Sequence, residues 1–248
     1  LCSLTATVTI TEPASALTAS ITNQVNVSCS GSPTGSVTVS GSGGTAPYQY
    51  SINGGTLQPG GTFNNLSAGN YTIIVVDGNN CATLVLVNIT QPASALVAAI
   101  SSQTNIACSG QSTGEATVTA IGGTFPYTYS WNSIPVQTTA TAFNLPAGTY
   151  IATVTDSLGC TATASVTILP PANPLAVNIT DQINVACYGQ STGSASANVS
   201  GGTLPYTFTW NTVPVQNTDT VTNLPAGSYT VTVTDASGCT DTASLIIT

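Results

Sequence analysis

The sequence predicts an all-β fold: a tandem array of three antiparallel β-sandwich domains that forms an extended rod. Two series of cysteines advance in steps of 79 residues along the 248-residue chain, one at Cys2, Cys81, Cys160 and Cys239, the other at Cys29, Cys108 and Cys187. A fixed step of this size indicates one structural unit repeated in tandem. Apolar and polar residues alternate within each repeat, as they do in strands, and clusters of Gly, Pro, Asn and Ser separate the alternating stretches.

The period sets the expected domain boundaries. We place copy 1 at 12–90, copy 2 at 91–169 and copy 3 at 170–248, and we interpret residues 1–11 as the last strand of a preceding copy. Short linkers that contain proline open the copies and restrict bending between neighbours. At a rise of roughly 3.3 Å per residue, each copy would be about 30 Å long and three copies about 100 Å. The chain starts without Met or a signal peptide, so we expect it to be part of a longer secreted protein.

Within a copy, we expect about seven short strands. In copy 2 they are placed at 95–101, 104–108, 114–120, 126–132, 138–144, 149–155 and 160–168. Seven short strands in a unit of this size favour an immunoglobulin-like sandwich. A core this small benefits from a covalent crosslink.

The composition excludes many functions. The chain has no Lys, Arg, His or Met, and its eight Asp and Glu residues give a net charge of -8. Nucleic-acid and anionic-membrane partners are therefore not expected, because both are bound through basic side chains. The chain has no His, which is the commonest residue in acid–base catalysis, and no basic side chain that could activate a Cys nucleophile. We therefore expect that the chain is not an enzyme and has no catalytic residues, no cofactor and no metal site. The longest apolar runs have the length of strands, so we also expect no insertion into a membrane.

Two recurring features are candidate binding sites. The aromatic residues Tyr127, Tyr129 and Trp131, and likewise Tyr206, Phe208 and Trp210, are spaced two apart and so share one strand face. Such a face is either a platform for stacking sugars or the core side of a strand. Copy 1 carries Ile52 at the Trp position, which favours the core.

The second feature is an Asp four residues before a Cys in every copy, at Asp77, Asp156 and Asp235. An Asp here can accept hydrogen bonds from backbone N–H groups two residues on. A calcium site usually needs more than one carboxylate, so we interpret these residues as turn formers.

Three motifs of copies 2 and 3 carry a family resemblance. They are Gly-Gly-Thr-x-Pro-Tyr-x-aromatic at 122–129, Leu-x-Ala-Gly-x-Tyr at 145–150 and Val-Thr-Asp-x-x-Gly-Cys at 154–160, repeated from 201, 224 and 233. Together they resemble the SprB-type repeat of Bacteroidetes gliding-motility adhesins, and more distantly PKD-type sandwich domains. The resemblance implies a very large cell-surface adhesin that is exported across the outer membrane, and it implies no catalytic residues.

The seven cysteines are expected to form disulfides, and the period allows three patterns. Bonds within a copy would join Cys29 with Cys81, Cys108 with Cys160, and Cys187 with Cys239. Bonds across a linker would join Cys2 with Cys29, Cys81 with Cys108, and Cys160 with Cys187. The third pattern joins Cys29 with Cys160 and Cys108 with Cys239. An immunoglobulin-like strand order places the two cysteines of one copy at opposite ends, too far apart for a bond, which favours the third pattern; the pattern within a copy stays the close alternative.

Three short segments resemble the Asp-Ser/Thr-apolar acceptor of Bacteroidetes O-glycosylation, which makes Ser157, Thr220 and Thr242 candidate glycosylation sites. The functional hypothesis is a stalk or fibre segment of a repetitive secreted surface adhesin, with gliding motility as the related process. Its expected partners are neighbouring copies of the same chain, further chains bundled side by side, and surface glycans. The alternative is a multivalent array of carbohydrate-binding modules.

Overall fold

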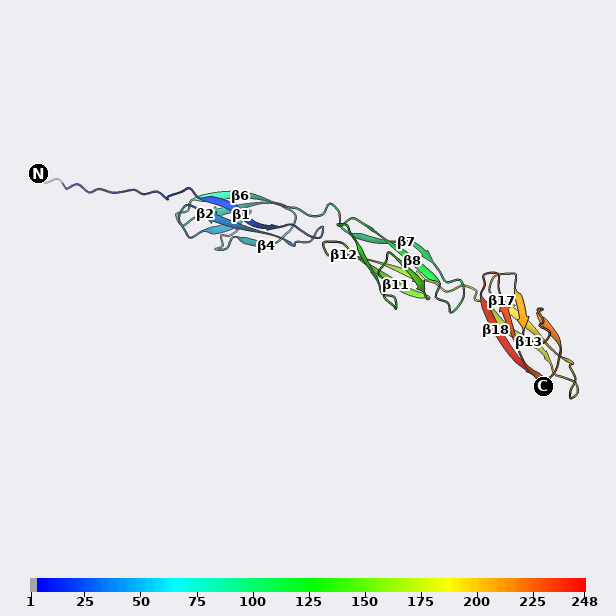
Figure 1. Ribbon diagram of the computed structural model, residues 1–248. Helices are drawn as coiled ribbons and strands as arrows, with labels where there is room; N and C mark the ends of the chain where they lie inside the picture. Colours follow the sequence, from blue (N-terminus) through cyan, green and yellow to red (C-terminus); the bar gives the residue numbers. More distant parts are fainter. Residues whose placement is uncertain (1–3) are drawn as a thin grey trace. The chain divides into compact units, whose positions relative to one another are not determined.

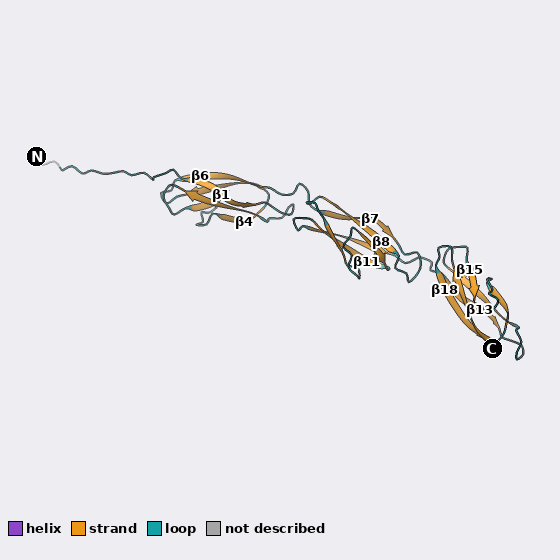
Figure 2. Ribbon diagram, viewed as in Figure 1, coloured by secondary structure: helices purple, strands orange, loops and turns teal. Residues whose placement is uncertain are grey.

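A computed structural model describes residues 4–248 (Figure 1). Eighteen strands, β1 to β18, form six three-stranded antiparallel sheets. Only strands, turns and loops occur in the described part of the chain (Figure 2). The predicted fold class, repeated antiparallel β-sandwiches, is confirmed. Within residues 4–248 nothing has the length and apolar character of a membrane-crossing helix.

The chain packs as two compact units. The first comprises the chain up to Ala98 together with Ala120–Thr128 and Val154–Ala162; the second comprises Ala99–Thr119, Tyr129–Thr153 and Thr163–Thr248. Residues of copy 2 therefore contribute to both units. The domain boundaries expected from the 79-residue period stay a prediction.

In the first unit, copy 1 forms two facing sheets. One has the strand order β1-β2-β4 and the other β3-β5-β6. The strands are β1 (Thr18–Val25), β2 (Gly35–Ser42), β3 (Gln49–Ile52), β4 (Thr62–Leu66), β5 (Gly69–Val76) and β6 (Ala82–Ile89). Val37 and Val39 of one sheet and Ile73 and Val75 of the other are almost fully buried in a common core. Their spacing of two explains the alternation in the sequence, because successive side chains of a strand point to opposite faces.

In the second unit, copy 3 repeats this arrangement with the orders β13-β14-β16 and β15-β17-β18. The strands are β13 (Ala176–Ile183), β14 (Gly193–Ser200), β15 (Thr207–Trp210), β16 (Thr220–Leu224), β17 (Gly227–Thr234) and β18 (Thr240–Ile247). Trp210 is fully buried and lies opposite Val231 on the neighbouring strand. In copy 1 the same position pairs Ile52 with Ile73.

The strands of copy 2 follow the same orders, β10-β8-β7 and β12-β11-β9. They are β7 (Val97–Thr104), β8 (Gly114–Ile121), β9 (Thr128–Trp131), β10 (Thr141–Leu145), β11 (Gly148–Thr155) and β12 (Thr161–Ile168). Each copy thus has six strands.

In residues 4–248, two expected strands do not form. The expected strand at 104–108 is replaced by the end of β7 and a turn, because Gly110 adopts a φ of 76° and the Gln111 N–H bonds the Cys108 carbonyl at 3.2 Å. Residues 4–11 form no strand and are exposed. The equivalent segment one period later, β6, is held as a strand by its pairing with β5, whereas no strand of the described residues pairs with 4–11.

Candidate functional site: the disulfide junctions

Two disulfides join residues that lie 131 positions apart. Cys29 is bonded to Cys160 with a Cα–Cα distance of 5.6 Å, and Cys108 to Cys239 with 5.2 Å. These are the pairs of the third pattern, and the structure has neither the bonds within a copy nor the bonds across a linker among the cysteines it describes. Cys81 and Cys187 are free and exposed. Cys2 lies outside the described residues.

The position of the strands explains why a copy does not bond to itself. In copy 1, Val27 near Cys29 donates a backbone hydrogen bond to Thr90, just beyond the end of β6. Cys81 immediately precedes the start of the same strand. At about 3.3 Å per residue, the eight residues of β6 place roughly 25 Å between these two ends. A disulfide tolerates a Cα separation of only about 7 Å.

The cysteine at the start of the last strand is held by the recurring Asp. The Oδ1 atom of Asp156 accepts hydrogen bonds from the backbone N–H groups of Leu158 at 3.0 Å and Cys160 at 2.9 Å. Its Oδ2 atom accepts a third bond, from the Thr124 N–H at 2.9 Å. Asp77 and Asp235 repeat all three bonds with distances of 2.8–2.9 Å.

These hydrogen bonds set the ionisation of the three carboxyl groups. The Thr45 N–H is the largest influence on Asp77 and lowers the pKa of its side chain below the ordinary value of 3.8. For Asp156 and Asp235 the largest single influence is burial, which raises the pKa, but the combined backbone N–H bonds outweigh it and the pKa of each is lowered. The folded chain therefore favours three ionised carboxylates without any basic side chain.

The Gly-Gly-Thr motif connects this turn to the linker. The Gly44 N–H donates to the Ser15 carbonyl of the linker at 2.9 Å, and Gly123 and Gly202 make the same bond in the other copies. Gly44 has a φ of 57°, and a Cβ atom added there would lie 2.5 Å from Oδ2 of Asp77. Only glycine therefore allows the motif to contact both the linker and the carboxylate.

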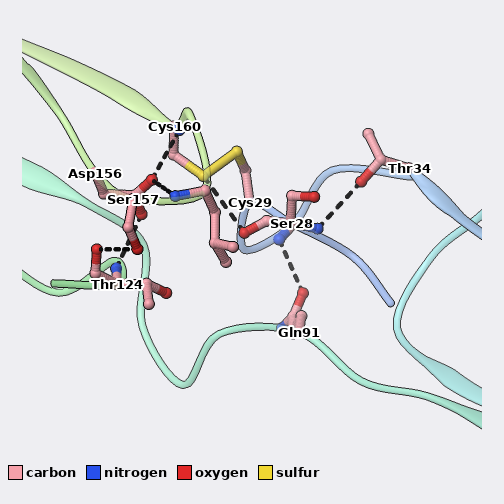
Figure 3. The surroundings of a disulfide bond; sticks show 10 residues. Ser28, Cys29, Thr34, Gln91, Thr124, Asp156, Ser157 and Cys160 are labelled. Atoms are coloured by element: carbon pink, nitrogen blue, oxygen red, sulfur yellow. Dashed lines mark hydrogen bonds between the residues drawn. A yellow bond between two sulfur atoms is a disulfide. The ribbon is translucent and has the colours of Figure 1, made fainter. Parts of the chain in front are cut away.

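Figure 3 shows the surroundings of the Cys29–Cys160 disulfide, which is the first of the two junctions. Cys29 lies in a turn in which the Ser28 N–H bonds Oγ1 of Thr34. The side chain of Gln91, from the linker, accepts the Gly31 N–H at 2.9 Å. Sγ of Cys160 lies 3.4 Å from the Ser28 carbonyl oxygen, so the turn and the last strand of the next copy are in close contact.

Each disulfide borders a shallow groove between the turn and the linker. The groove at Cys29–Cys160 has a volume of about 360 Å³ and the groove at Cys108–Cys239 about 270 Å³. In residues 4–248 no group of three or more His, Cys, Asp or Glu side chains is arranged to hold a metal ion. The lining residues are mainly small, polar or proline residues, which provide a packing surface rather than a set of reactive groups.

The aromatic residues spaced two apart, Tyr127, Tyr129 and Trp131 with their equivalents in copy 3, form an aromatic stripe. This stripe lies partly in the core and partly at the surface. Trp131 and Trp210 are 1% and 0% exposed, and each indole N–H donates to a backbone carbonyl, of Thr139 and Thr218 respectively. Neither indole face is open to a sugar. Tyr127 is half-buried, and its hydroxyl donates to the Gly122 carbonyl at 2.7 Å. Its equivalents Tyr48 and Tyr206 make the same bond to the first glycine of their motifs.

The three candidate glycosylation sites are exposed. Ser157 follows the Asp of the turn and donates its hydroxyl to the Thr124 carbonyl at 3.0 Å. Thr220 begins β16 and Thr242 lies on β18. Their modification stays a prediction.

Reasoning from sequence missed the bond between the Asp and the Gly-Gly-Thr motif. The signal was present: the Thr precedes the Asp by 32 residues in all three copies. A constant spacing between a small polar motif and a carboxylate is compatible with direct contact, but spacing alone does not distinguish contact from a shared period.

Three segments of the chain match the family model described as the SprB repeat, at residues 21–57, 100–135 and 179–215. The resemblance to this repeat is thereby confirmed. A search of curated protein sequences finds no match.

Several solved structures are similar to the chain at low identity. The eight N-terminal immunoglobulin domains of the Down syndrome cell adhesion molecule share 14% identity over 94% of this chain, with a TM-score of 0.35. The chain spans 42% of the length of that structure. A tetra-tandem repeat from the extending region of a large adhesion protein shares 15% identity over 93% of this chain and 74% of its own, with a TM-score of 0.28. A structure from a 1.5-MDa bacterial ice-binding adhesin shares 16% sequence identity with this chain. The match covers 86% of this chain and 88% of that structure, with a TM-score of 0.32.

Proposed function

We propose, from the three SprB repeats, that this chain is a stalk segment of a large, repetitive cell-surface adhesin. The role is mechanical: the copies act as spacers and carry load. The observation that carries this proposal is the pair of disulfides, because each one joins a copy to the next across 131 residues of sequence. A pull on the two ends of the chain is then transmitted through sulfur as well as through the linkers.

The composition supports an exposed location. Trypsin-like proteases cut after Lys or Arg, and the chain has neither. It also has no side-chain ion pairs that salt could weaken, since every charged side chain is acidic. Disulfides persist mainly in secreted and surface proteins.

Single-molecule force spectroscopy tests the load-bearing role. Both ends of the chain are tethered, and its maximum extension is compared before and after reduction. With the disulfides intact, the covalent path between the ends bypasses most of the residues from 29 to 239. Full extension should then be roughly a third of that of the reduced chain, at about 3.4 Å per residue. Equal extension in both states contradicts the proposal.

The proposed location has its own test. We infer export across the outer membrane and display on a gliding cell from the family resemblance. Antibodies against the folded chain should label intact cells that make the protein, and deletion of the gene should impair gliding. Labelling only after the cells are lysed would contradict surface display.

The alternative, a multivalent carbohydrate-binding array, has less support. The stacking platform considered for this strand face would need an exposed indole at Trp131 or Trp210, and both are buried. We therefore assign the aromatic stripe to folding and propose no glycan site on it.

A further inference from the structure

We propose that the outer face of the sheet β3-β5-β6 in copy 1 is a dimerisation surface, which packs against the same face of a second copy of this chain. Four apolar side chains form this surface, which we call the outer patch. They are Ile74 and Val76 of β5, and Leu84 and Leu86 of β6. The inference goes beyond the stalk role and does not depend on it.

The outer patch is contiguous and open to solvent. β5 and β6 pair in a register that places Ile74 opposite Leu84 and Thr72 opposite Leu86. Side chains that lie opposite each other on one sheet face are about 5 Å apart at their Cβ atoms, so they form one surface. Leu84 is 59% exposed and Leu86 is 71% exposed. The patch residues alternate along both strands with residues of the buried core, and so they point away from it.

Both strands have the sequence pattern of strands that are covered on two faces. β5 contains the run Ile73-Ile74-Val75-Val76, and β6 contains the run Leu84-Val85-Leu86-Val87. Apolar and polar residues alternate when one face of a sheet meets water, whereas a continuous apolar run is typical of a strand buried on both faces. The sheet β1-β2-β4 of the same copy covers the inner face. The pattern therefore points to a partner that covers the outer face.

The outer patch is a property of copy 1 and not of the fold. One period later its four positions are Thr153, Thr155, Thr163 and Ser165, and two periods later they are Thr232, Thr234, Thr242 and Ser244. Copy 2 is preceded and followed by another copy in the sequence, and Thr163 and Ser165 are nevertheless exposed. Neighbouring copies thus leave this face open. The exposure of Leu84 and Leu86 therefore does not depend on where the sequence begins.

Charge favours the same face of a second molecule as the partner. Every charged side chain of the protein is acidic and the net charge is -8, so two molecules repel each other at long range. The outer patch carries no charge. The acids of copy 1 are Glu12, which lies in the linker, and Asp77, which is buried beyond the end of β5. Two molecules can therefore approach through this face without placing like charges together.

Complementarity selects the same partner. The equivalent faces of copies 2 and 3 present hydroxyl groups at all four positions, so the apolar sheet face that this chain can offer to the outer patch is the outer patch of another molecule. Packing of identical faces places a twofold axis between them, and such a contact closes at the dimer. Two sheets packed in this way lie about 10 Å apart, with their side chains interdigitated.

The size of the face sets the strength of the dimer. The eight residues of β5 at a rise of about 3.3 Å, and three strands spaced about 4.8 Å apart, give a face of roughly 25 Å by 14 Å. An interface of this size is at the lower end of specific protein contacts. We therefore expect a weak and reversible dimer, with a dissociation constant on the order of 0.1–1 mM.

Analytical ultracentrifugation tests the proposal. The 248-residue chain carries Cys2→Ser, Cys81→Ser and Cys187→Ser, so that no disulfide can form between molecules. We expect a monomer–dimer equilibrium up to about 1 mM, and sodium chloride should strengthen the dimer because it screens the net charge. A chain that stays monomeric at about 1 mM, oligomers larger than the dimer, or a dimer that salt weakens would overturn the proposal.

A quadruple variant removes the outer patch with residues taken from copy 2: Ile74→Thr, Val76→Thr, Leu84→Thr and Leu86→Ser. It should remain folded, which a thermal melt checks, because copies 2 and 3 fold with these residues. Its dissociation constant should rise at least tenfold. Added in tenfold excess to the parent chain, it should leave the amount of parent dimer unchanged, since a twofold contact needs the patch on both molecules. Undiminished dimerisation, or competition with the parent, would contradict the assigned face.

The double variant Ile134→Thr with Val213→Thr is the matched control. Both side chains are apolar and fully exposed, and both lie outside the outer patch, so this variant should dimerise like the parent. If the quadruple variant does not fold, Leu84→Thr with Leu86→Ser changes only the two most exposed patch residues and should weaken the dimer several-fold. An equal loss in the control would overturn the proposal. So would a parent chain that binds neutral phosphatidylcholine vesicles while remaining monomeric, because the patch would then serve a membrane surface.

Discussion

At the residue scale, the three recurring aspartates show how the fold uses its few charges. Each carboxylate accepts three backbone N–H bonds and so ties a turn to the Gly-Gly-Thr motif; Asp156 does this with Leu158, Cys160 and Thr124. The side chains are 4–6% exposed. A buried carboxylate is stable when it is hydrogen-bonded in this way, and no cation is required.

The lowered pKa values predict acid sensitivity. The folded state favours the ionised form of Asp77, Asp156 and Asp235, so their contribution to stability is fully present above the ordinary pKa of 3.8 and is lost as the pH falls through the folded pKa values. We expect the melting temperature of the chain to fall as the pH is lowered from 4. We also expect Asp156→Asn to lower the melting temperature at neutral pH, because the Asn side chain has only one oxygen that accepts hydrogen bonds. Thermal melts across this range measure both effects.

Asp219→Asn is the matched control. Asp219 is exposed and its side chain makes no hydrogen bond in the described structure, although the charge change is the same. If both variants melt alike at neutral pH, the stabilising role of the Asp156 bonds is refuted.

At the scale of strands, alternation of apolar residues was sufficient to predict most of the fold. The strands expected in copy 2 at 114–120, 149–155 and 160–168 lie within a residue of β8, β11 and β12. The expected strand at 104–108 failed because Asn105 to Thr113 forms a turn around Gly110, whose positive φ cannot be read from apolar spacing. Ile52, the equivalent of Trp131 in copy 1, correctly indicated that the Trp131 side chain lies in the core. This comparison was possible because the sequence repeats.

Trp131 tests the packing of its strand. Trp131→Ala should cost about 3–5 kcal/mol of unfolding free energy, the usual loss for a buried aromatic residue, measured by urea denaturation. Trp131→Ile should cost less, because copy 1 packs Ile at this position. Ile134→Ala changes a fully exposed side chain and should stay within about 0.5 kcal/mol of the parent chain. A loss at Trp131 no larger than that at Ile134 would disprove its role in the core.

At the scale of the whole molecule, the sequence reduced the possible disulfide pairings to three patterns but did not decide between them. The period allowed three pairings, and strand order favoured the one that joins Cys29 to Cys160. A decision required knowing that Cys29 and Cys81 lie at opposite ends of β6, which is a property of the folded sheet. The contact of Gln91 with Gly31 was likewise unpredictable, because Pro170 replaces Gln91 in the next copy.

Removal of one disulfide tests its contribution to stability. The double variant Cys108→Ser with Cys239→Ser should lose about 2–5 kcal/mol, because the bond closes a long loop and restricts the unfolded chain. The double variant Cys81→Ser with Cys187→Ser removes two free thiols and should leave stability unchanged. Denaturation under non-reducing conditions compares them; similar midpoints for both would argue against stabilisation by the bond.

The two disulfides also overlap along the sequence. The closed loop from Cys29 to Cys160 and the closed loop from Cys108 to Cys239 share the residues between Cys108 and Cys160. Every peptide bond from Cys29 to Cys239 therefore belongs to at least one covalent ring. A protease that severs the backbone once anywhere in this interval opens a ring but releases no fragment, so the chain stays in one piece after a cut that would divide domains joined by linkers alone.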